Sequence, residues 1–128
     1  MAEEKKIQNQ ILREFATRPE MRLWRANVGT AVPISFCKLV ERAILDGDRK
    51  RALDLLGSMP VIQFGIKGQA DLTGILPGGT RLEIEVKSSK GKQRKDQKVF
   101  GNMIEKKGGL YVLAKSTGDV ADAIDSFL

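Results

Sequence analysis

The sequence predicts an α/β domain in which a mixed central β-sheet is flanked by helices. Three observations predict it. Apolar residues recur at helical spacing near both ends of the chain and in its middle. Short runs with strand-like alternation lie between these segments, and two of the runs are joined by a Pro-Gly-Gly turn at residues 77–79. The chain has no internal repeat and no long linker, so its 128 residues fit one domain.

The first half of the chain is expected to be mostly helical. Residues 3–17 have the pattern of an amphipathic helix, residues 22–26 that of a short strand, and Asn27 and Gly29 that of a turn. Residues 34–56 are helical in pattern and divide into two pieces near Gly47. The expected apolar stripes are Ile7, Ile11, Leu12 and Phe15; Leu39, Val40, Ala43 and Ile44; and Ala52, Leu55 and Leu56.

The second half alternates strands and helices. Strands are expected at residues 61–66, 70–76, 81–88 and 110–114. A helix over residues 92–107 is followed by Gly108 and Gly109, which can terminate it, and Ser116 or Thr117 can cap a last helix. The residues expected to face inward on these two helices are Val99, Phe100, Met103 and Ile104, and Val120, Ala123, Ile124 and Phe127.

The chain contains no histidine and a single cysteine, Cys37. Imidazole and thiolate metal sites and Ser-His triads are thereby excluded, so a bound metal has to be held by oxygen, as Mg²⁺ and Mn²⁺ are. A lone cysteine forms no internal disulfide and indicates the cytoplasm. We expect Cys37 to be a small buried hydrophobe, and Trp24, Phe64 and Phe100 to be core aromatics.

The net charge of +6 is concentrated in one segment. Residues 87–98 contain six basic side chains against Asp96 alone, a balance of +5. Such a patch suits a phosphate backbone, although most short charge runs are only solvated surface. The basic residues are Lys87, Lys90, Lys92, Arg94, Lys95 and Lys98.

Two carboxylates are predicted to meet across the hairpin. Folding the two strands about Gly78 places Asp71 opposite Glu85, to within a residue of register. Two facing carboxylates repel each other, and a divalent cation would convert that repulsion into coordination. Strand alternation puts Lys87 on the same face as Glu85, where an ammonium group can act on a phosphate or on water. The alternative is a solvated strand face in which Arg81 and Lys87 pair with Glu83 and Glu85.

Three segments carry a family resemblance. They are Gly-Gln-Ala-Asp-Leu-Thr-Gly at residues 68–74, Glu-Ile-Glu-Val-Lys at 83–87 followed by Gln97, and Trp-Arg-Ala-Asn-Val-Gly at 24–29. Together they resemble the PD-(D/E)xK nuclease superfamily, and within it the virus-type replication-repair nuclease (VRR-NUC) domain. The resemblance implies a restriction-endonuclease-like core. The helical segment at about residues 30–59 would then be an insertion after the first strand, which could cover a substrate groove or form a subunit interface.

The resemblance also assigns roles to the residues of the hairpin. It implies that Asp71, Glu85 and the backbone carbonyl of Val86 bind Mg²⁺ or Mn²⁺, that Lys87 is the catalytic lysine, and that Gln97 supports the site from the following helix.

The opening helix of the family often contributes a glutamate to the metal ligands. Glu4 is the position that matches, and it leans toward the apolar stripe. Glu14 lies on the same stripe and is an alternative ligand.

The expected activity is metal-dependent hydrolysis of DNA phosphodiester bonds by a structure-selective endonuclease. By resemblance this would be a homodimer similar to Holliday-junction resolvases, acting in DNA repair or recombination in a bacterium or a phage-infected cell. A flap or branched-DNA nuclease is the alternative within the enzyme class. A non-catalytic nucleic-acid-binding module, or an assembly protein with a solvated charged strand, is the alternative outside it.

Overall fold

A computed structural model describes residues 2–26 and 29–128 of the chain. The described residues form two compact units, which are treated separately below. The sheet unit comprises Met1–Asn27 and Gly65–Leu128, and the hairpin unit comprises Val28–Phe64. The turn expected at Asn27 lies outside the described residues, and Gly29 begins a strand rather than a turn. No helix of the described residues is long and apolar enough to cross a membrane.

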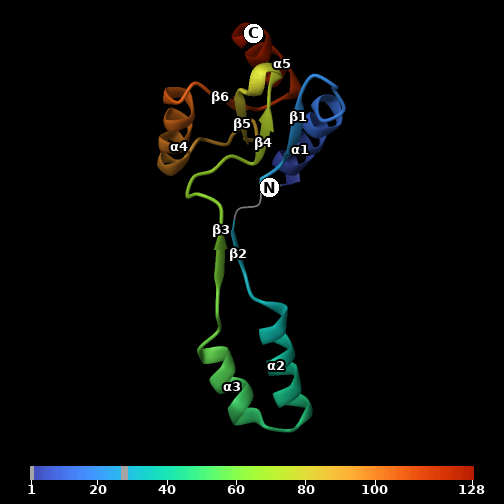
Figure 1. The fold of residues 1–128 in the computed structure, drawn as a ribbon, viewed down its shortest axis with the longest axis vertical. Helices are drawn as coiled ribbons and strands as arrows, with labels where there is room; N and C mark the ends of the chain where they lie inside the picture. The colour runs from blue at the N-terminus through green and yellow to red at the C-terminus, as the bar shows by residue number, and fades with distance from the viewer. Residues whose placement is uncertain (1, 27–28) are drawn as a thin grey trace. The chain divides into compact units, whose positions relative to one another are not determined.

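The sheet unit is built on a mixed four-stranded sheet, as the sequence predicts (Figure 1). Its strand order is β1-β4-β5-β6. The first three strands pair antiparallel and β6 pairs parallel with β5, a connection that requires a crossover helix, here α4. The strands are β1 (Arg22–Arg25), β4 (Leu72–Ile75), β5 (Arg81–Val86) and β6 (Leu110–Ala114).

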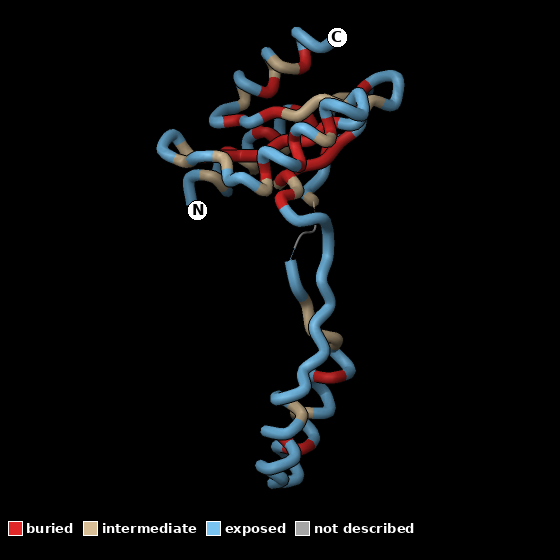
Figure 2. The backbone as a smooth tube through the Cα atoms, turned by 90° about the vertical axis from the view of Figure 1, so that its left-hand side faces the viewer, coloured by how far each residue is buried: buried red, intermediate tan, exposed pale blue. Residues whose placement is uncertain are grey.

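Helices α1 (Ala2–Phe15) and α5 (Thr117–Phe127) pack on one face of this sheet. Three of the four residues of the apolar stripe predicted for α1 are buried, with Ile11 and Phe15 fully enclosed, whereas Leu12 is only partly buried. Ser116 caps α5 by accepting a hydrogen bond from the backbone of Asp119. Phe127 was expected inside but is 43% exposed, because it lies in the last turn of the chain. These contacts form the main core, which is concentrated within the sheet unit (Figure 2).

Helix α4 (Lys95–Lys106) covers the opposite face, and Figure 1 shows α4 and α1 on either side of the strands. Phe100 and Ile104 pack with Ala70 and Tyr111. Val99 was expected inside but is 61% exposed, since the covered arc of α4 is narrower than the apolar arc of its sequence. Gly108 ends the helix with φ +88°, a conformation that favours glycine.

The hairpin unit joins a two-stranded ribbon to two helices. Strands β2 (Gly29–Ala31) and β3 (Ile62–Phe64) pair antiparallel, and helices α2 (Ile34–Leu45) and α3 (Arg49–Gly57) lie between them in sequence. The break between the helices falls at Gly47, as predicted, with φ +73°. Asp48 then caps α3 through the backbone of Arg51.

Two predictions about single residues of the hairpin unit are wrong. Phe64 was expected in the core but is 47% exposed, because every residue of β3 is exposed. Cys37 was expected to be buried and is also exposed. Both errors share one cause, which is that this unit has very little interior of its own to receive apolar side chains.

Candidate active site

Asp71 and Glu85 face each other across the β4–β5 hairpin. The strand register pairs Leu72 with Ile84 and Thr73 with Glu83. Continued by one residue, this register sets Asp71 opposite Glu85, the pairing that the sequence predicts. The two strands turn through Pro77–Gly79, where Gly78 and Gly79 adopt positive φ.

The polar residues of β5 are buried. Glu83 is fully enclosed, and the exposed fractions of Glu85 and Lys87 are only 3% and 8%. Their side chains point to the face that α4 covers, because the intervening Ile84 and Val86 belong to the main core on the opposite face. The alternative is therefore wrong about solvation, but its two ion pairs do form, with Arg81 at 3.0 Å from Glu83 and Lys87 at 3.2 Å from Glu85. Ionisable groups are rarely buried unless they are paired or bind an ion, and the buried Glu83, Glu85 and Lys87 are each part of an ion pair.

The carboxylate of Asp71 is held by the backbone of β5. Its Oδ2 accepts a 2.8 Å hydrogen bond from the Val86 amide. Burial raises the pKa of Asp71 above its usual value, and this hydrogen bond and the charge of Lys87 oppose the rise. The metal-binding role expected of the Val86 carbonyl stays a prediction, and the contact with Asp71 is made by the Val86 amide.

Glu85 makes contacts through one oxygen. Its Oε1 accepts a 2.7 Å hydrogen bond from Gln97 and lies 3.2 Å from the Lys87 ammonium. Its Oε2 is buried and has no hydrogen-bond partner among the described residues. Burial raises the pKa of Glu85 to about 7, and the negative charge of Asp71 adds to this rise. The charges of Lys87 and Arg94 act in the opposite direction.

Gln97 reaches Glu85 because the start of α4 packs tightly against the segment that leads to Asp71. A Cβ atom on Gly68 would lie 2.2 Å from the carbonyl oxygen of Asp96, so no other residue fits there without displacing the helix. Gly68 also has φ +80°. Gly68 thus allows the segment before β4 to pack directly against the backbone of the first turn of α4.

Of the two glutamates considered on α1, Glu4 is the one close to the site. Its Oε1 accepts a 3.4 Å hydrogen bond from the Ser88 amide, and its charge contributes to the raised pKa of Asp71. Glu14 is exposed and pairs instead with Arg18, at 3.7 Å.

The basic segment is divided by the fold. Lys87 is buried beside Glu85, whereas the other five basic residues are exposed and remain available to a ligand. Arg94 is also ion-paired with Asp96, at 3.3 Å. The exposed residues are Lys90, Lys92, Arg94, Lys95 and Lys98.

Two aromatic residues on this face of the sheet were not recognised from the sequence as part of the site. Tyr111 lies beside Glu83 in β6, and its hydroxyl accepts a 3.0 Å hydrogen bond from Gln93. Burial raises its pKa to about 12, and the charges of Glu85 and Asp71 add to the effect. Trp24 was expected in the core but is 43% exposed at the sheet edge, next to Thr73. The sequence does not show that β1 and β6 lie on either side of the β4–β5 hairpin, and this strand order is what brings the two rings to the same face of the sheet as the carboxylates.

The donor set of the site fits a hard divalent cation. Every candidate ligand is an oxygen, and Glu85 has a buried oxygen without a partner in the described part of the chain. Among the residues that the structure describes, no group of three or more Asp, Glu or Cys residues is close enough together to hold a metal ion. Two protein carboxylates are nevertheless a sufficient set for Mg²⁺, which keeps several water ligands.

The fold and site define a mixed α/β protein in which a half-buried aspartate faces a buried glutamate beside a lysine. No family model matches the chain, and neither a curated protein nor a solved structure matches it.

Proposed function

We propose that this chain is a Mg²⁺- or Mn²⁺-dependent nuclease that hydrolyses DNA phosphodiester bonds. The observation that carries the proposal is that the half-buried Asp71 faces the buried Glu85, with Lys87 at 3.2 Å from Glu85. The proposal also rests on the resemblance of these segments to the VRR-NUC domain of the PD-(D/E)xK nucleases.

Two neighbouring carboxylates, of which one is buried and the other half-buried, destabilise a fold unless something offsets their charge. The raised pKa values of both acids record that cost. A divalent cation would remove it, with Asp71 and Glu85 as ligands, and Glu4 would add negative charge near the site. The bound cation would supply a nucleophile at neutral pH by acidifying water, and it would offset charge on the phosphate.

The chain's own residues would orient the reaction. Gln97 holds Glu85 in one rotamer through the 2.7 Å hydrogen bond, and the Val86 amide does the same for Asp71. Lys87 has a fixed position because its ammonium lies beside Glu85 in a buried site. There it would neutralise the non-bridging oxygens of the scissile phosphate.

The exposed lysines at the start of α4 would bind the substrate backbone. Lys92, Lys95 and Lys98 follow Lys87 closely in the chain and are exposed. Their contacts would be electrostatic and independent of base sequence. We propose branched DNA, a four-way junction or a flap, as the substrate, in a repair or recombination role.

The experiment is cleavage of labelled four-way junction, flap and plain duplex DNA with Mg²⁺, Mn²⁺ or EDTA. Asp71→Asn keeps an oxygen to accept from the Val86 amide but removes the charge, so the fold should survive while cleavage is lost. Glu85→Gln and Lys87→Met should also abolish cleavage, with DNA binding retained. Glu83→Gln is the matched control, because it removes another buried carboxylate of the same strand without touching the proposed ligands.

The cleavage results distinguish a nuclease from a non-catalytic DNA-binding module. Metal-dependent cleavage that is lost in the three site variants and kept in Glu83→Gln would support the nuclease. Wild-type protein that binds all three DNAs and cuts none with either metal would overturn it, and would favour a non-catalytic binding module based on the exposed lysines.

A further inference from the structure

Helix α4 leaves part of its own face of the sheet open. The helix packs on β6 and β5, where a Cβ atom added to Gly101 would lie 2.7 Å from the ring of Tyr111. Strand β1 forms the other edge of the sheet, away from β6 (Figure 1). Toward that edge Trp24 is 43% exposed and Ile75 is 45% exposed. The part of this face over β1 and β4 is therefore accessible to a ligand.

The strand register shows which side chains share the accessible part. Strands β1 and β4 pair Trp24 with Thr73 and Arg22 with Ile75. Strands β4 and β5 pair Ile75 with Arg81. Directly opposed residues of an antiparallel pair point to the same face of a sheet. The exposed members of this group are called the open sheet surface below, and they are Arg22, Trp24, Ile75 and Arg81.

The open sheet surface lies on the same face as the candidate active site. On β4, Thr73 and Ile75 follow Asp71 at every second position, which places all three on one face. Measured along the strands, Trp24 is displaced from the position of Asp71 by about 7 Å, and Arg22 by about 14 Å. A single substrate can therefore contact the carboxylates and this surface at once.

Two arginines lie on the open sheet surface with the exposed ring. The side chain of Arg22 is exposed and has no ion-pair or hydrogen-bond partner among the described residues. The side chain of Arg81 is 55% exposed and lies 3.0 Å from Glu83 Oε1. Glu83 is itself fully enclosed, so it positions Arg81 without presenting its own charge at the surface. Because a guanidinium has five N–H donors, Arg81 keeps donors for a ligand.

We infer that the open sheet surface binds an unpaired DNA strand beside the site of cleavage. An unpaired base has a free face that can stack on Trp24, and such stacking needs no particular base. The guanidinium groups of Arg22 and Arg81 match the geometry of phosphate oxygens. This inference rests on the proposed nuclease function and specifies its substrate as DNA with a single-stranded arm, such as a flap.

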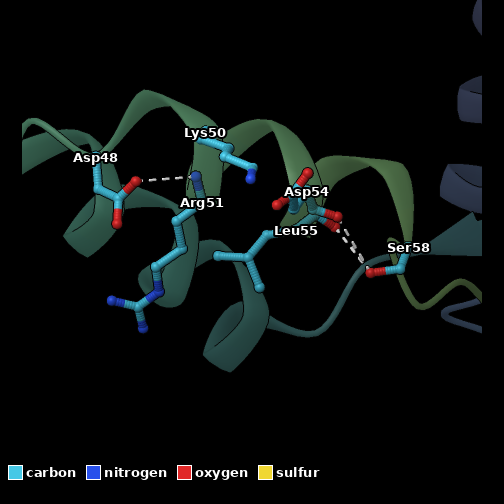
Figure 3. A pocket seen from close by; sticks show the side chains of 6 residues that line it. All are labelled: Asp48, Lys50, Arg51, Asp54, Leu55 and Ser58. Atoms are coloured by element: carbon cyan, nitrogen blue, oxygen red, sulfur yellow. Dashed lines mark hydrogen bonds between the residues drawn. The ribbon is translucent and has the colours of Figure 1, made fainter.

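The charged surface of α3 lacks these features. Figure 3 shows Lys50 and Arg51 together with Asp54 along a shallow pocket on this helix. Asp48 accepts a hydrogen bond from the Arg51 amide, and Ser58 donates to the Asp54 carbonyl, so both polar ends of the pocket are bonded within the helix. Charges of both signs offset each other there, and no aromatic residue lines the pocket. We therefore expect no contact between this pocket and an unpaired strand.

The test is the binding of a labelled oligothymidylate and of a blunt duplex of equal length, measured by fluorescence anisotropy in EDTA. Trp24→Leu should weaken binding of the single strand by roughly tenfold and leave duplex binding unchanged. Trp24→Phe keeps an aromatic ring and should restore most of the affinity.

The arginines are tested through the salt dependence of the same binding. Arg22→Gln and Arg81→Gln should each reduce the slope of log K against log salt by about 0.7 on the single strand, the value for one phosphate contact. Arg22→Gln disturbs no side-chain contact of the described residues, so its result does not depend on a change in the fold.

Two exposed arginines elsewhere serve as matched controls. Arg13 lies on α1, which packs on the opposite face of the sheet, and Arg51 lies on α3 (Figure 3). Arg13→Gln and Arg51→Gln each remove one positive charge. Neither should change the affinity for the single strand or the salt slope.

Photocrosslinking gives an independent readout of the contact with the ring. A 5-iodouracil placed in the unpaired arm of a flap should cross-link to Trp24 on irradiation, and mass spectrometry of the peptides would identify the residue. The same base placed in the duplex part of the flap should not cross-link to Trp24.

Three results would overturn the inference. They are wild-type affinity for the single strand in both Trp24→Leu and Arg22→Gln, equal losses on the single strand and the duplex, and a slope change in Arg13→Gln as large as that in Arg22→Gln. The first would leave the surface to a protein partner, and the other two would mean that binding is not specific to an unpaired strand.

These binding results are independent of cleavage. Wild-type protein that binds the single strand through Trp24 but cuts no DNA with either metal would overturn the nuclease proposal and keep the inference. Wild-type protein that cuts flap DNA, with unchanged single-strand binding in Trp24→Leu and Arg22→Gln, would overturn the inference and keep the nuclease.

Discussion

The side-chain amide of Gln97 links the start of α4 to the buried carboxylate of Glu85. Its Nε2 donates to Glu85 Oε1 at 2.7 Å, and its Oε1 accepts from the backbone amide of Arg94 at 2.9 Å. One side chain therefore caps the helix and orients a candidate metal ligand. A glutamate here would cap the helix equally well but would repel Glu85.

Gln97→Ala should weaken the fold and the site together. It removes a buried donor to a carboxylate, so we expect a loss of about 1–3 kcal/mol in the free energy of unfolding at pH 8. The matched control is Asn102→Ala, which removes an exposed amide from the same helix and should cost little. Urea unfolding of both variants in EDTA measures the difference, and equal losses would contradict the role assigned to Gln97.

Stability should depend on pH through Glu85. The pKa of its carboxyl is raised from 4.5 to about 7 in the folded protein, so between these values the folded state binds more protons than the unfolded state. The free energy of unfolding should therefore fall as pH rises from about 4.5 to 7. Glu85→Gln should flatten this decline in EDTA, whereas Glu105→Gln, at an exposed position of α4, should preserve it. An unchanged pH profile in Glu85→Gln would contradict the prediction.

Two glycines with the same backbone conformation should respond differently to alanine. Gly68 and Gly78 have φ of +80° and +85°, so both substitutions carry the strain of a positive φ, about 1–3 kcal/mol. An added methyl group meets nothing within 4 Å at Gly78, but at Gly68 it lies 2.2 Å from the carbonyl oxygen of Asp96. Gly68→Ala should thus destabilise the protein clearly more than Gly78→Ala in thermal unfolding. Equal effects would mean that the segment before β4 does not pack on α4 this closely.

Trp24 should report substrate binding. It is the only tryptophan, it is 43% exposed, and it lies beside Thr73, about 7 Å along the strand direction from the level of Asp71. An unpaired base that stacks on the ring would quench its fluorescence. We expect quenching by flap DNA in EDTA, with much less by blunt duplex. Unchanged emission at saturation, with binding measured by anisotropy, would show that DNA does not reach Trp24.

The salt dependence of DNA binding should map to the start of α4. Replacing Lys92 and Lys95 by serine should reduce the slope of log K against log salt by about 2, if each lysine contacts one phosphate. Serine at Lys106 and Lys107, exposed at the other end of α4, should leave the slope unchanged. Equal changes in the slope from the two pairs of substitutions would show that DNA does not bind preferentially at the start of α4.

The sequence by itself determined the elements and the carboxylate pairing. Helical and strand periodicity predicted the helices and strands closely, with the break at Gly47 and the whole of β6 in place, but it missed β2, whose first residue was expected in a turn. The pairing of Asp71 with Glu85 followed from a short hairpin, because its turn sets the register of both strands. These features depend on residues that are close together in the sequence, so local sequence patterns can predict them.

Only the tertiary structure decided which apolar and charged residues are buried. Glu83 and Lys87 are enclosed because α4 crosses their face of the sheet, a contact between segments that periodicity does not relate. Trp24 is exposed because α4 covers only part of that face, and Val99 because only a narrow arc of α4 is covered by the sheet. Phe64 and Cys37 are exposed because the hairpin unit has almost no interior. A pattern states which residues can be buried together, whereas burial depends on which other element is there to cover them.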